Sequence, residues 1–173
     1  VQAVSALLAA LLILAIGISV LLRSRRNRVF FAFASFSAIV SIWHLFTFLS
    51  FTTSNTAMQW LSLWAASTIP PTAIRFFRIF LAQPSIGGQQ RGPRVTLAWT
   101  VLAYTALIYS AIVRPDVIDK LWFAAPFGVY VFGSLYRRVW DMYRQYRSTV
   151  RQVERTRVRY LALGGFIATT LTL

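Results

Sequence analysis

The chain has no cysteine, one histidine, one lysine and only four acidic residues among its 173 residues. Without cysteine it has no disulfides, no thiolate metal ligands and no cysteine nucleophile. A single histidine, His44, cannot supply the several ligands that a metal or haem site needs. The one lysine, Lys120, falls at the end of an expected helix, which argues against a retinal Schiff base, and the four carboxylates fall in loops or at helix ends. We therefore expect no metal, no cofactor and no catalytic residue in this segment.

Negative charge is scarce while positive charge is abundant. The formal net charge is +14, yet 57% of the residues are hydrophobic and only 13% are charged. An average soluble domain has about 45–50% apolar and about 25% charged residues. A nucleic-acid-binding protein carries its positive charge as a patch on a soluble fold, and this composition is not that of a soluble fold. It indicates a membrane protein without a nucleic-acid partner.

Long runs without any charged residue predict membrane-spanning helices. Residues 1–22 and 29–74 contain none, and a spanning helix needs about 20 mostly apolar residues. The second run is too long for one span, and the polar stretch at 52–56 divides it into a helical hairpin. We predict an all-α, polytopic transmembrane bundle with six visible spans, at residues 2–22, 29–51, 57–82, 95–113, 120–136 and 158–173.

The first predicted span also has the apolar, N-terminal character of a signal peptide. No basic region precedes it, however, and four arginines follow it within residues 23–28, which is typical of a stop-transfer signal. We therefore expect a retained helix. The chain begins at Val1 rather than at methionine, and the sixth span ends at Leu173 in apolar sequence. We expect a piece of a longer protein that was truncated before a seventh span.

The basic residues are segregated between alternate loops. Sixteen of the 18 lie in three segments, 23–28, 75–94 and 137–159, and the other loops carry only Arg114 and Lys120. Loops rich in lysine and arginine stay on the cytoplasmic side, so we expect the N-terminus outside and all three basic segments inside. Both outer loops are short, which leaves no room for an extracellular ligand-binding domain.

Four residues within the expected spans are candidates for binding a ligand or sensing a signal: His44, Trp43, Trp64 and Arg75. An ionisable group inside a membrane is a functional hypothesis by default. Each candidate also has a structural interpretation. His44 can be a neutral histidine that is bonded to a neighbouring helix or placed near the outer interface. Arg75 can extend its guanidinium to the headgroups, and the two tryptophans can be packing residues. The tryptophans at 60, 99, 122 and 140 are expected in the aromatic belts at the membrane surfaces.

Prolines inside two expected spans are hinge candidates. Pro70 and Pro71 remove two backbone donors from the third span and should bend it. The carbonyl groups that they release can be satisfied by hydroxyls, and Thr68 and Thr72 are the candidates. Pro126 has the same effect in the fifth span. A hinge that moves during signalling and a fixed packing bend both agree with the sequence.

The longest basic segment, residues 137–157, contains neither glycine nor proline. We expect it to be a cytoplasmic helix that is continuous with the fifth and sixth spans or hinged somewhere between them. Its apolar residues recur at Val139, Tyr143, Tyr146 and Val150, at helical spacing, so that arginine fills the other face. We interpret the segment as an amphipathic helix that binds anionic lipid at the inner surface. A homodimer or signal-relay contact is the alternative. The arginines concerned are Arg137, Arg138, Arg144, Arg147, Arg151 and Arg155.

Together these features resemble the N-terminal seven-transmembrane-helix sensor region of bacterial membrane histidine kinases. The resemblance lies in RSRRNR followed by an aromatic helix with SIWHLF, in WLSLWAASTIPPTAIRFFRIFLAQ, in RQVERTRVRYLALGG, and in the expected topology. It implies a multi-pass protein of the bacterial inner membrane that passes a membrane or small lipophilic signal to a cytoplasmic, dimeric kinase. This chain contains none of the kinase motifs, so no catalysis is assigned to it.

Two other functions agree with the sequence. One is a transporter or channel, although secondary transporters more often carry intramembrane acids or internal repeats, and neither is evident here. The other is a structural subunit of a larger membrane complex. The function that we expect is a sensor and anchor domain, which relays its signal to a kinase or other output domain of the same chain.

Overall fold

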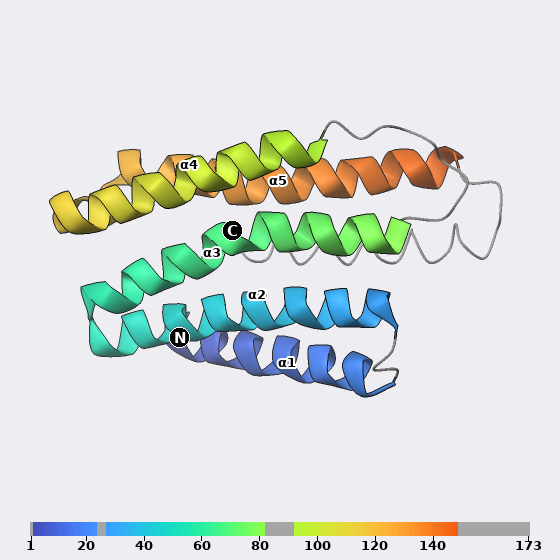
Figure 1. Cartoon of the computed structure of the whole chain (residues 1–173). Coiled ribbons are helices and arrows are strands. Elements are labelled where there is room, and N and C mark those ends of the chain that lie inside the picture. The colour runs from blue at the N-terminus through green and yellow to red at the C-terminus, as the bar shows by residue number, and fades with distance from the viewer. Residues whose placement is uncertain (1, 24–26, 82–91, 149–173) are drawn as a thin grey trace. The chain divides into compact units, whose positions relative to one another are not determined.

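The computed structural model of the chain describes residues 2–23, 27–81 and 92–148, and these residues form helices joined by short turns (Figure 1). This confirms the predicted all-α class. The predicted span at 158–173 lies outside the described residues. The elements are α1 (Gln2–Arg23), α2 (Arg28–Thr53), α3 (Thr56–Leu81), α4 (Gly92–Val113), the short 3-10 helix η1 (Pro115–Asp119) and α5 (Leu121–Ser148).

The chain divides within α5 into two compact units, Val1–Phe127 and Gly128–Leu173. The first unit contains α1 to α4, η1 and the first turns of α5. Of the second unit, residues 128–148 are described, and they are the remainder of α5. The sites discussed below therefore belong to one unit or to the other.

Two helices are long and apolar enough to cross a membrane: α1 with 22 residues and α2 with 26. The apolar part of α4, Leu97–Val113, is shorter. α3 is less apolar because Arg75 and Arg78 lie close to its end. Length and composition thus support a membrane association for the first two predicted spans. The six-span count and the orientation of the chain stay predictions.

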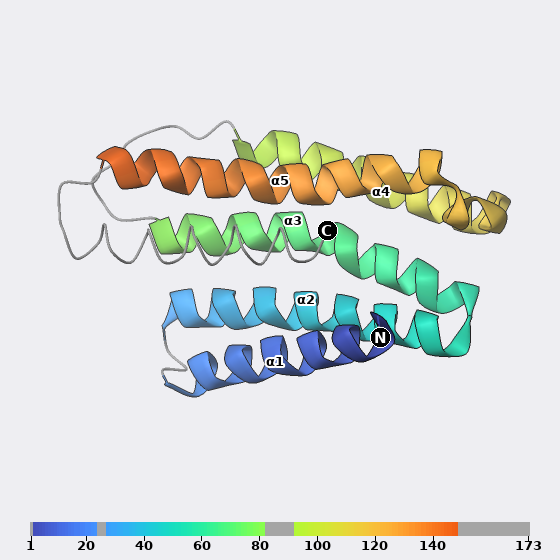
Figure 2. The same cartoon turned by 180° about the vertical axis from the view of Figure 1, so that it is seen from behind.

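The turn between α2 and α3 lies within the polar stretch that predicted it. Ser54 adopts a left-handed conformation with a φ of 48°, and its N–H donates to the Ser50 carbonyl at 3.1 Å. This bond closes the end of α2. Asn55 then begins α3, because its side-chain oxygen accepts the N–H of Ala57 at 2.8 Å, as N-cap residues do. The two linking residues make α2 and α3 an antiparallel hairpin, and α2 lies between α1 and α3 (Figures 1 and 2).

Small residues bring α1 close to α2. On α1 the buried residues are Ala6, Ala10 and Gly17, and the Ser41 hydroxyl on α2 donates to the Ala10 carbonyl at 2.8 Å. Residues without bulky side chains let two helix backbones approach each other. The rest of α1 is apolar and exposed, at Val4, Leu8, Leu11, Leu12, Ile16, Ile18 and Leu22 among others.

Aromatic rings fill the space between α2 and the second half of α3. Phe76 is the centre of this group, with 3% of its surface exposed. Its ring centroid lies 5.5 Å from that of Phe33 and 6.1 Å from that of Phe36, both on α2. On α3 itself, Phe77 and Phe80 lie at 5.0 and 5.9 Å. Rings at these separations attract one another beyond their buried area.

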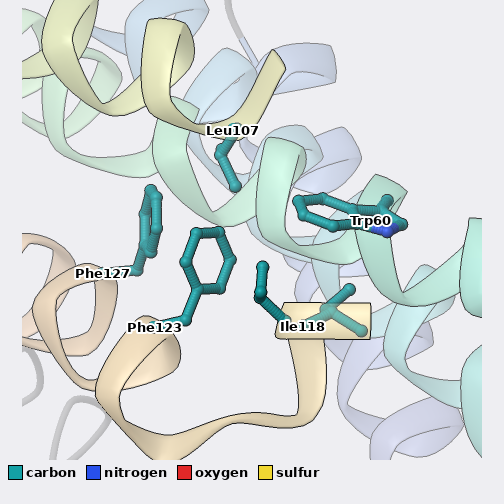
Figure 3. Packing of buried hydrophobic residues seen from close by; sticks show 6 residues of the cluster. Trp60, Leu107, Ile118, Phe123 and Phe127 are labelled. Atoms are coloured by element: carbon teal, nitrogen blue, oxygen red, sulfur yellow. The ribbon is translucent and has the colours of Figure 1, made fainter. Parts of the chain in front are cut away.

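A second core lies where the first half of α3 meets α4, η1 and the start of α5 (Figure 3). η1 folds the chain back after α4, and Val117 and Ile118 from this turn are buried. Leu107 on α4 has no exposed surface. The complete cluster is Trp60, Leu107, Val117, Ile118, Phe123 and Phe127. It fixes the beginning of α5 against α3.

α5 continues as one helix from Leu121 to Ser148, with Pro126 inside it. The proline bends or weakens a helix locally but does not end this one. Gly128 and Gly133 follow it, and nothing lies within 4 Å of the position where either would carry a Cβ. The structure thus confirms that residues 137–148 are helical. The rest of the predicted basic segment, up to 157, lies outside the described residues.

Candidate functional site

The most deeply buried part of the first unit is the segment of α3 that contains the two prolines. Ser67, Ile69 and Pro70 are each less than 2% exposed. The helix assignment runs through Pro70 and Pro71 without interruption, and both views show α3 bending near its middle (Figures 1 and 2). The predicted bend is therefore present, and it lies inside the helix assembly.

The threonines beside the bend bond to other carbonyl groups than those we expected. Pro70 and Pro71 release the carbonyls four residues earlier, at Ala66 and Ser67. The Thr68 hydroxyl donates instead to Ala65 O at 2.6 Å, and that of Thr72 donates to Thr68 O at 2.8 Å and Ile69 O at 2.9 Å. The expectation was wrong because a helical threonine reaches only the carbonyls three or four residues before it. Thr68 can therefore reach the carbonyls of residues 64 and 65, and Thr72 those of residues 68 and 69. Neither reaches the released carbonyls at 66 and 67.

A polar bridge joins α4 to α3 before the bend. The Tyr104 hydroxyl donates a long hydrogen bond to the Trp64 carbonyl at 3.5 Å. The Tyr104 ring meets the Trp64 ring edge-on, with centroids 5.9 Å apart. Trp64, one of the predicted sensing residues, thus packs against α4.

A second polar bridge joins α2 to α3. The hydroxyls of Thr47 and Ser62 lie 2.9 Å apart, and Thr47 also donates to the Trp43 carbonyl at 2.9 Å. A hydroxyl both donates and accepts, so either member of the Thr47–Ser62 pair can be the donor. Sequence analysis missed this pair. The position of the turn could have revealed it. Each hydroxyl lies seven residues from the nearer turn residue, Ser54 or Asn55, so the two lie at the same level of the antiparallel hairpin.

Replacing Thr47 with valine should lower the free energy of unfolding by about 1 kcal/mol, as measured for interhelical hydrogen bonds in membranes. The change keeps the shape of the side chain and leaves the Ser62 hydroxyl without its partner. Unfolding would be followed by tryptophan fluorescence during titration of mixed micelles with sodium dodecyl sulfate. A cycle with Ser62→Ala isolates the pair, and Thr53→Val, at an exposed hydroxyl of the same helix, is the control. Additive effects of the two substitutions would contradict the bridge.

The four predicted sensing residues do not form a single site. His44 is half-buried, and its ring lies 4.8 Å from that of Trp43. It forms no hydrogen bond with any described residue, so no bond to a neighbouring helix is seen. Because Thr47 is level with Ser62, His44 is about level with Ala65, and Arg75 lies ten residues further along α3. Ten residues correspond to about 15 Å along a helix axis.

Arg75 is exposed and forms no ion pair with any residue in the described part of the chain. This position agrees with a side chain that extends to lipid headgroups. In the same part of the chain, no three histidine, cysteine or acidic side chains come together as a metal site would require.

Trp60 occupies a different place from the one that we expected. Only 9% of its surface is exposed, and its ring meets that of Phe123 edge-on at 5.8 Å, so it belongs to the core in Figure 3 rather than to an aromatic belt. The reason is that α3 turns this position towards η1 and α5. Its indole Nε1 is buried and has no hydrogen-bond partner within the described residues, an arrangement that costs about 1–3 kcal/mol. The tryptophans at 99, 122 and 140 are exposed.

The second unit presents basic and aromatic groups together on α5. Arg137, Trp140 and Arg144 follow one another at spacings of three and four residues, which places them on one face of a helix. Arg137 and Arg144 are exposed, the Trp140 and Tyr143 rings lie 5.7 Å apart, and the Arg144 guanidinium lies 6.0 Å from the Trp140 ring centre. The side chains of Arg138, Arg147, Arg151 and Arg155 lie outside the described set.

Replacing both Arg137 and Arg144 with glutamine should weaken the association of anionic lipid with the reconstituted protein. A basic residue near an anionic surface contributes about 1 kcal/mol, which is about fivefold in affinity for each arginine. The measurement is the fraction of spin-labelled phosphatidylglycerol immobilised by the protein, at low and at high salt. Arg114→Gln, in the loop expected on the other side, is the matched control. An equal effect of both changes would contradict a lipid site on α5.

The first unit thus contains two hydroxyl bridges beside a buried bend and, in the neighbouring core, an indole N–H without a partner among the described residues. The second unit by itself carries an exposed basic face on α5. Comparisons with protein-family models, curated proteins and solved structures found no match.

Proposed function

We propose that this chain is the membrane-embedded sensor and anchor domain of a signal-transducing histidine kinase. It crosses a bacterial inner membrane several times with its N-terminus outside, and it relays a membrane or small lipophilic signal to a cytoplasmic output domain of the same chain. Two observations support the membrane placement: the length and apolar surface of α1 and α2, and the confinement of 16 of 18 basic residues to the three segments 23–28, 75–94 and 137–159. The kinase connection comes from the sequence resemblance.

The observation that carries a relay role is the course of α5. Its first turns are fixed in the core by Phe123 and Phe127, and the same helix continues to Ser148, where its exposed arginines lie. A helix passes a shift or rotation of its first turns along its axis through its backbone hydrogen bonds, and Pro126, which removes one of these bonds, is the position at which α5 would bend instead. A change in the packing around Trp60 would therefore reach the cytoplasmic end of α5.

The bend in α3 is the proposed moving part. It separates the half of α3 that packs with η1 and α5 from the half that packs with the phenylalanines of α2. The bridges from Thr47 and Tyr104 both reach the first half. A ligand or a change of the bilayer that alters the packing of this half would change the angle of the bend. The helix is easier to bend at the prolines because they lack the backbone N–H groups that would bond to the carbonyls four residues earlier.

The experiment is the double change Pro70→Ala/Pro71→Ala in the full-length protein. We expect the response of autophosphorylation to the signal, or to a change of lipid composition, to be lost, because an unbent helix takes away the difference between the two arrangements. Basal autophosphorylation remains as the measure of folding. Pro115→Ala, in η1, is the control, and Pro126→Ala tests the second hinge candidate. An unchanged response would contradict the mechanism, and solute flux through the protein in liposomes would contradict the sensor role itself.

A further inference from the structure

The indole N–H of Trp60 differs from the hydroxyl groups that surround the α3 bend. Those of Ser41, Thr47, Ser62, Thr68 and Thr72 are all paired. The Trp60 Nε1 is closed to solvent and has no partner in the part of the chain that the structure describes. Most buried polar groups in proteins are hydrogen-bonded, and each exception requires an explanation. A tryptophan N–H can only donate, so the missing group is an acceptor.

The cluster to which this N–H belongs is apolar. The partly buried residues packed against the cluster are Leu63, Ala103, Ala106 and Ala111, none of which has a side-chain acceptor. In Figure 3 the nitrogen-bearing edge of Trp60 points away from Phe123 and Phe127, so the N–H lies at the margin of the cluster. Three of the four neighbours are alanines, which leave little side chain to displace. An apolar molecule with one acceptor matches this environment.

The depth of Trp60 in the proposed membrane further restricts the chemical class of the acceptor. Trp60 comes four residues after Thr56, the first residue of α3, which is about 6 Å along the helix axis. If α3 spans the bilayer as proposed, this level is close to the boundary between headgroups and hydrocarbon, where tryptophan N–H groups normally find partners. Molecules with an acyl chain and a carbonyl group place the carbonyl oxygen at this boundary.

We propose that Trp60 Nε1 is the hydrogen-bond donor of a binding site for the carbonyl group of a lipophilic molecule. The site comprises Trp60 and its apolar neighbours on α3 and α4. Both the acyl ester of a bilayer lipid and a diffusible ketone or ester have the required chemistry. The inference rests on the membrane placement in the proposed function, and it names the chemical class of the lipophilic signal. Because Phe123 and Phe127 share the cluster, occupation of the site acts directly on the start of α5.

The first test measures the unaltered chain, and a substitution serves only to assign the signal. The 173-residue chain, with ¹⁵N-labelled tryptophan, is placed in nanodiscs of ester-linked or of ether-linked phosphatidylcholine, which differ only in the two carbonyl groups. Trp60→Phe serves to assign the resonance. If a lipid ester occupies the site, the Trp60 indole proton resonates further downfield in the ester lipid. If a diffusible molecule does, the signal is alike in both lipids but moves downfield when 2-dodecanone is added to the ether lipid, and dodecane has no such effect.

The second test measures the ligand instead of the protein. Binding of 2-dodecanone with a ¹³C-labelled carbonyl is followed by the shift of that carbon in ether-lipid nanodiscs. Trp60→Phe keeps an aromatic ring but removes the donor, so we expect binding about tenfold weaker, as for the loss of one hydrogen bond. Trp122→Phe is the matched control. Trp122 directly precedes Phe123 of the cluster, but its own side chain is 67% exposed and lies outside the cluster. The control should bind as the original chain does.

The outcomes separate this inference from the proposed function. If the chemical shift of the Trp60 indole proton changes neither with the lipid linkage nor with 2-dodecanone, the carbonyl site is overturned. The indole N–H would then donate to water or to another segment of the chain. Equal binding by Trp60→Phe and Trp122→Phe overturns it as well. Binding that depends on Trp60 but leaves kinase output unchanged in the full-length protein supports the site and contradicts the sensor role.

Discussion

Replacing Phe76 with alanine should lower the free energy of unfolding by about 3–5 kcal/mol, the range for a buried aromatic residue. Phe76 is 3% exposed, and its ring lies within about 6 Å of four others, those of Phe33, Phe36, Phe77 and Phe80. Alanine removes all four ring contacts at once. The neighbouring helices can close the cavity only in part, since α2 and α3 are also joined through Thr47 and Ser62.

The measurement is unfolding in mixed micelles, and Phe31→Ala is the control. Phe31 is an exposed phenylalanine of α2, with 54% of its surface accessible, so its loss should change the free energy of unfolding little. A Phe76→Ala variant as stable as Phe31→Ala would show that the two helices are not packed through this ring. The aromatic cluster would then have to be withdrawn as the contact that holds the second half of α3.

The helices were predictable because charge and polarity mark their ends. The α2–α3 turn was expected at 52–56 and lies at Ser54 and Asn55, since a polar stretch inside an apolar run has no stable place within a membrane. The first span was expected to end at residue 22 and α1 ends at Arg23. α5 continues past residue 136, the predicted end of the fifth span, as a single helix to Ser148, which agrees with a basic segment that contains neither glycine nor proline.

The packing faces could not be predicted in the same way. In a soluble helix the apolar side identifies the core, whereas a membrane helix is apolar towards lipid and towards protein alike. Trp60 was therefore assigned to the membrane surface, and its place in the core became visible only with the position of η1. The same ambiguity hid Phe76. His44 was singled out by its chemistry, yet the structure gives it one aromatic neighbour and no polar partner among the described residues.

The hydroxyl pairs were predictable in part, unlike the helix ends, which were predictable, and the packing faces, which were not. Once the short turn is known, the antiparallel hairpin fixes which residues of α2 and α3 are level, and Thr47 and Ser62 follow by counting from Ser54 and Asn55. The bend at Pro70 and Pro71 was likewise visible in the sequence, but the partners of Thr68 and Thr72 required the direction of each side chain. Sequence thus predicts the level of a polar group along a helix better than its partner.

Changing Gly17 to alanine should separate α1 from α2 and cost about 2 kcal/mol, within the range for overpacked sites. A Cβ at this position would lie 2.8 Å from the Cβ of Ser37. That atom is attached directly to the α2 backbone, so no rotation of the Ser37 side chain can move it. The helices must move apart, and the hydrogen bond from Ser41 to the Ala10 carbonyl, two turns further along α1, is strained as well.

A second change identifies the cause of this effect. Gly17→Ala combined with Ser37→Gly removes the Ser37 Cβ, and we expect it to recover most of the lost stability, although each single change destabilises. Gly133→Ala is the matched control for helix propensity, because nothing lies within 4 Å of its added Cβ, and alanine favours a helix by about 1 kcal/mol over glycine. Unfolding in mixed micelles would measure all four variants. If Gly17→Ala were as stable as Gly133→Ala, or if the double change brought no recovery, α1 and α2 would not be in the close contact on which the order of the first three helices depends.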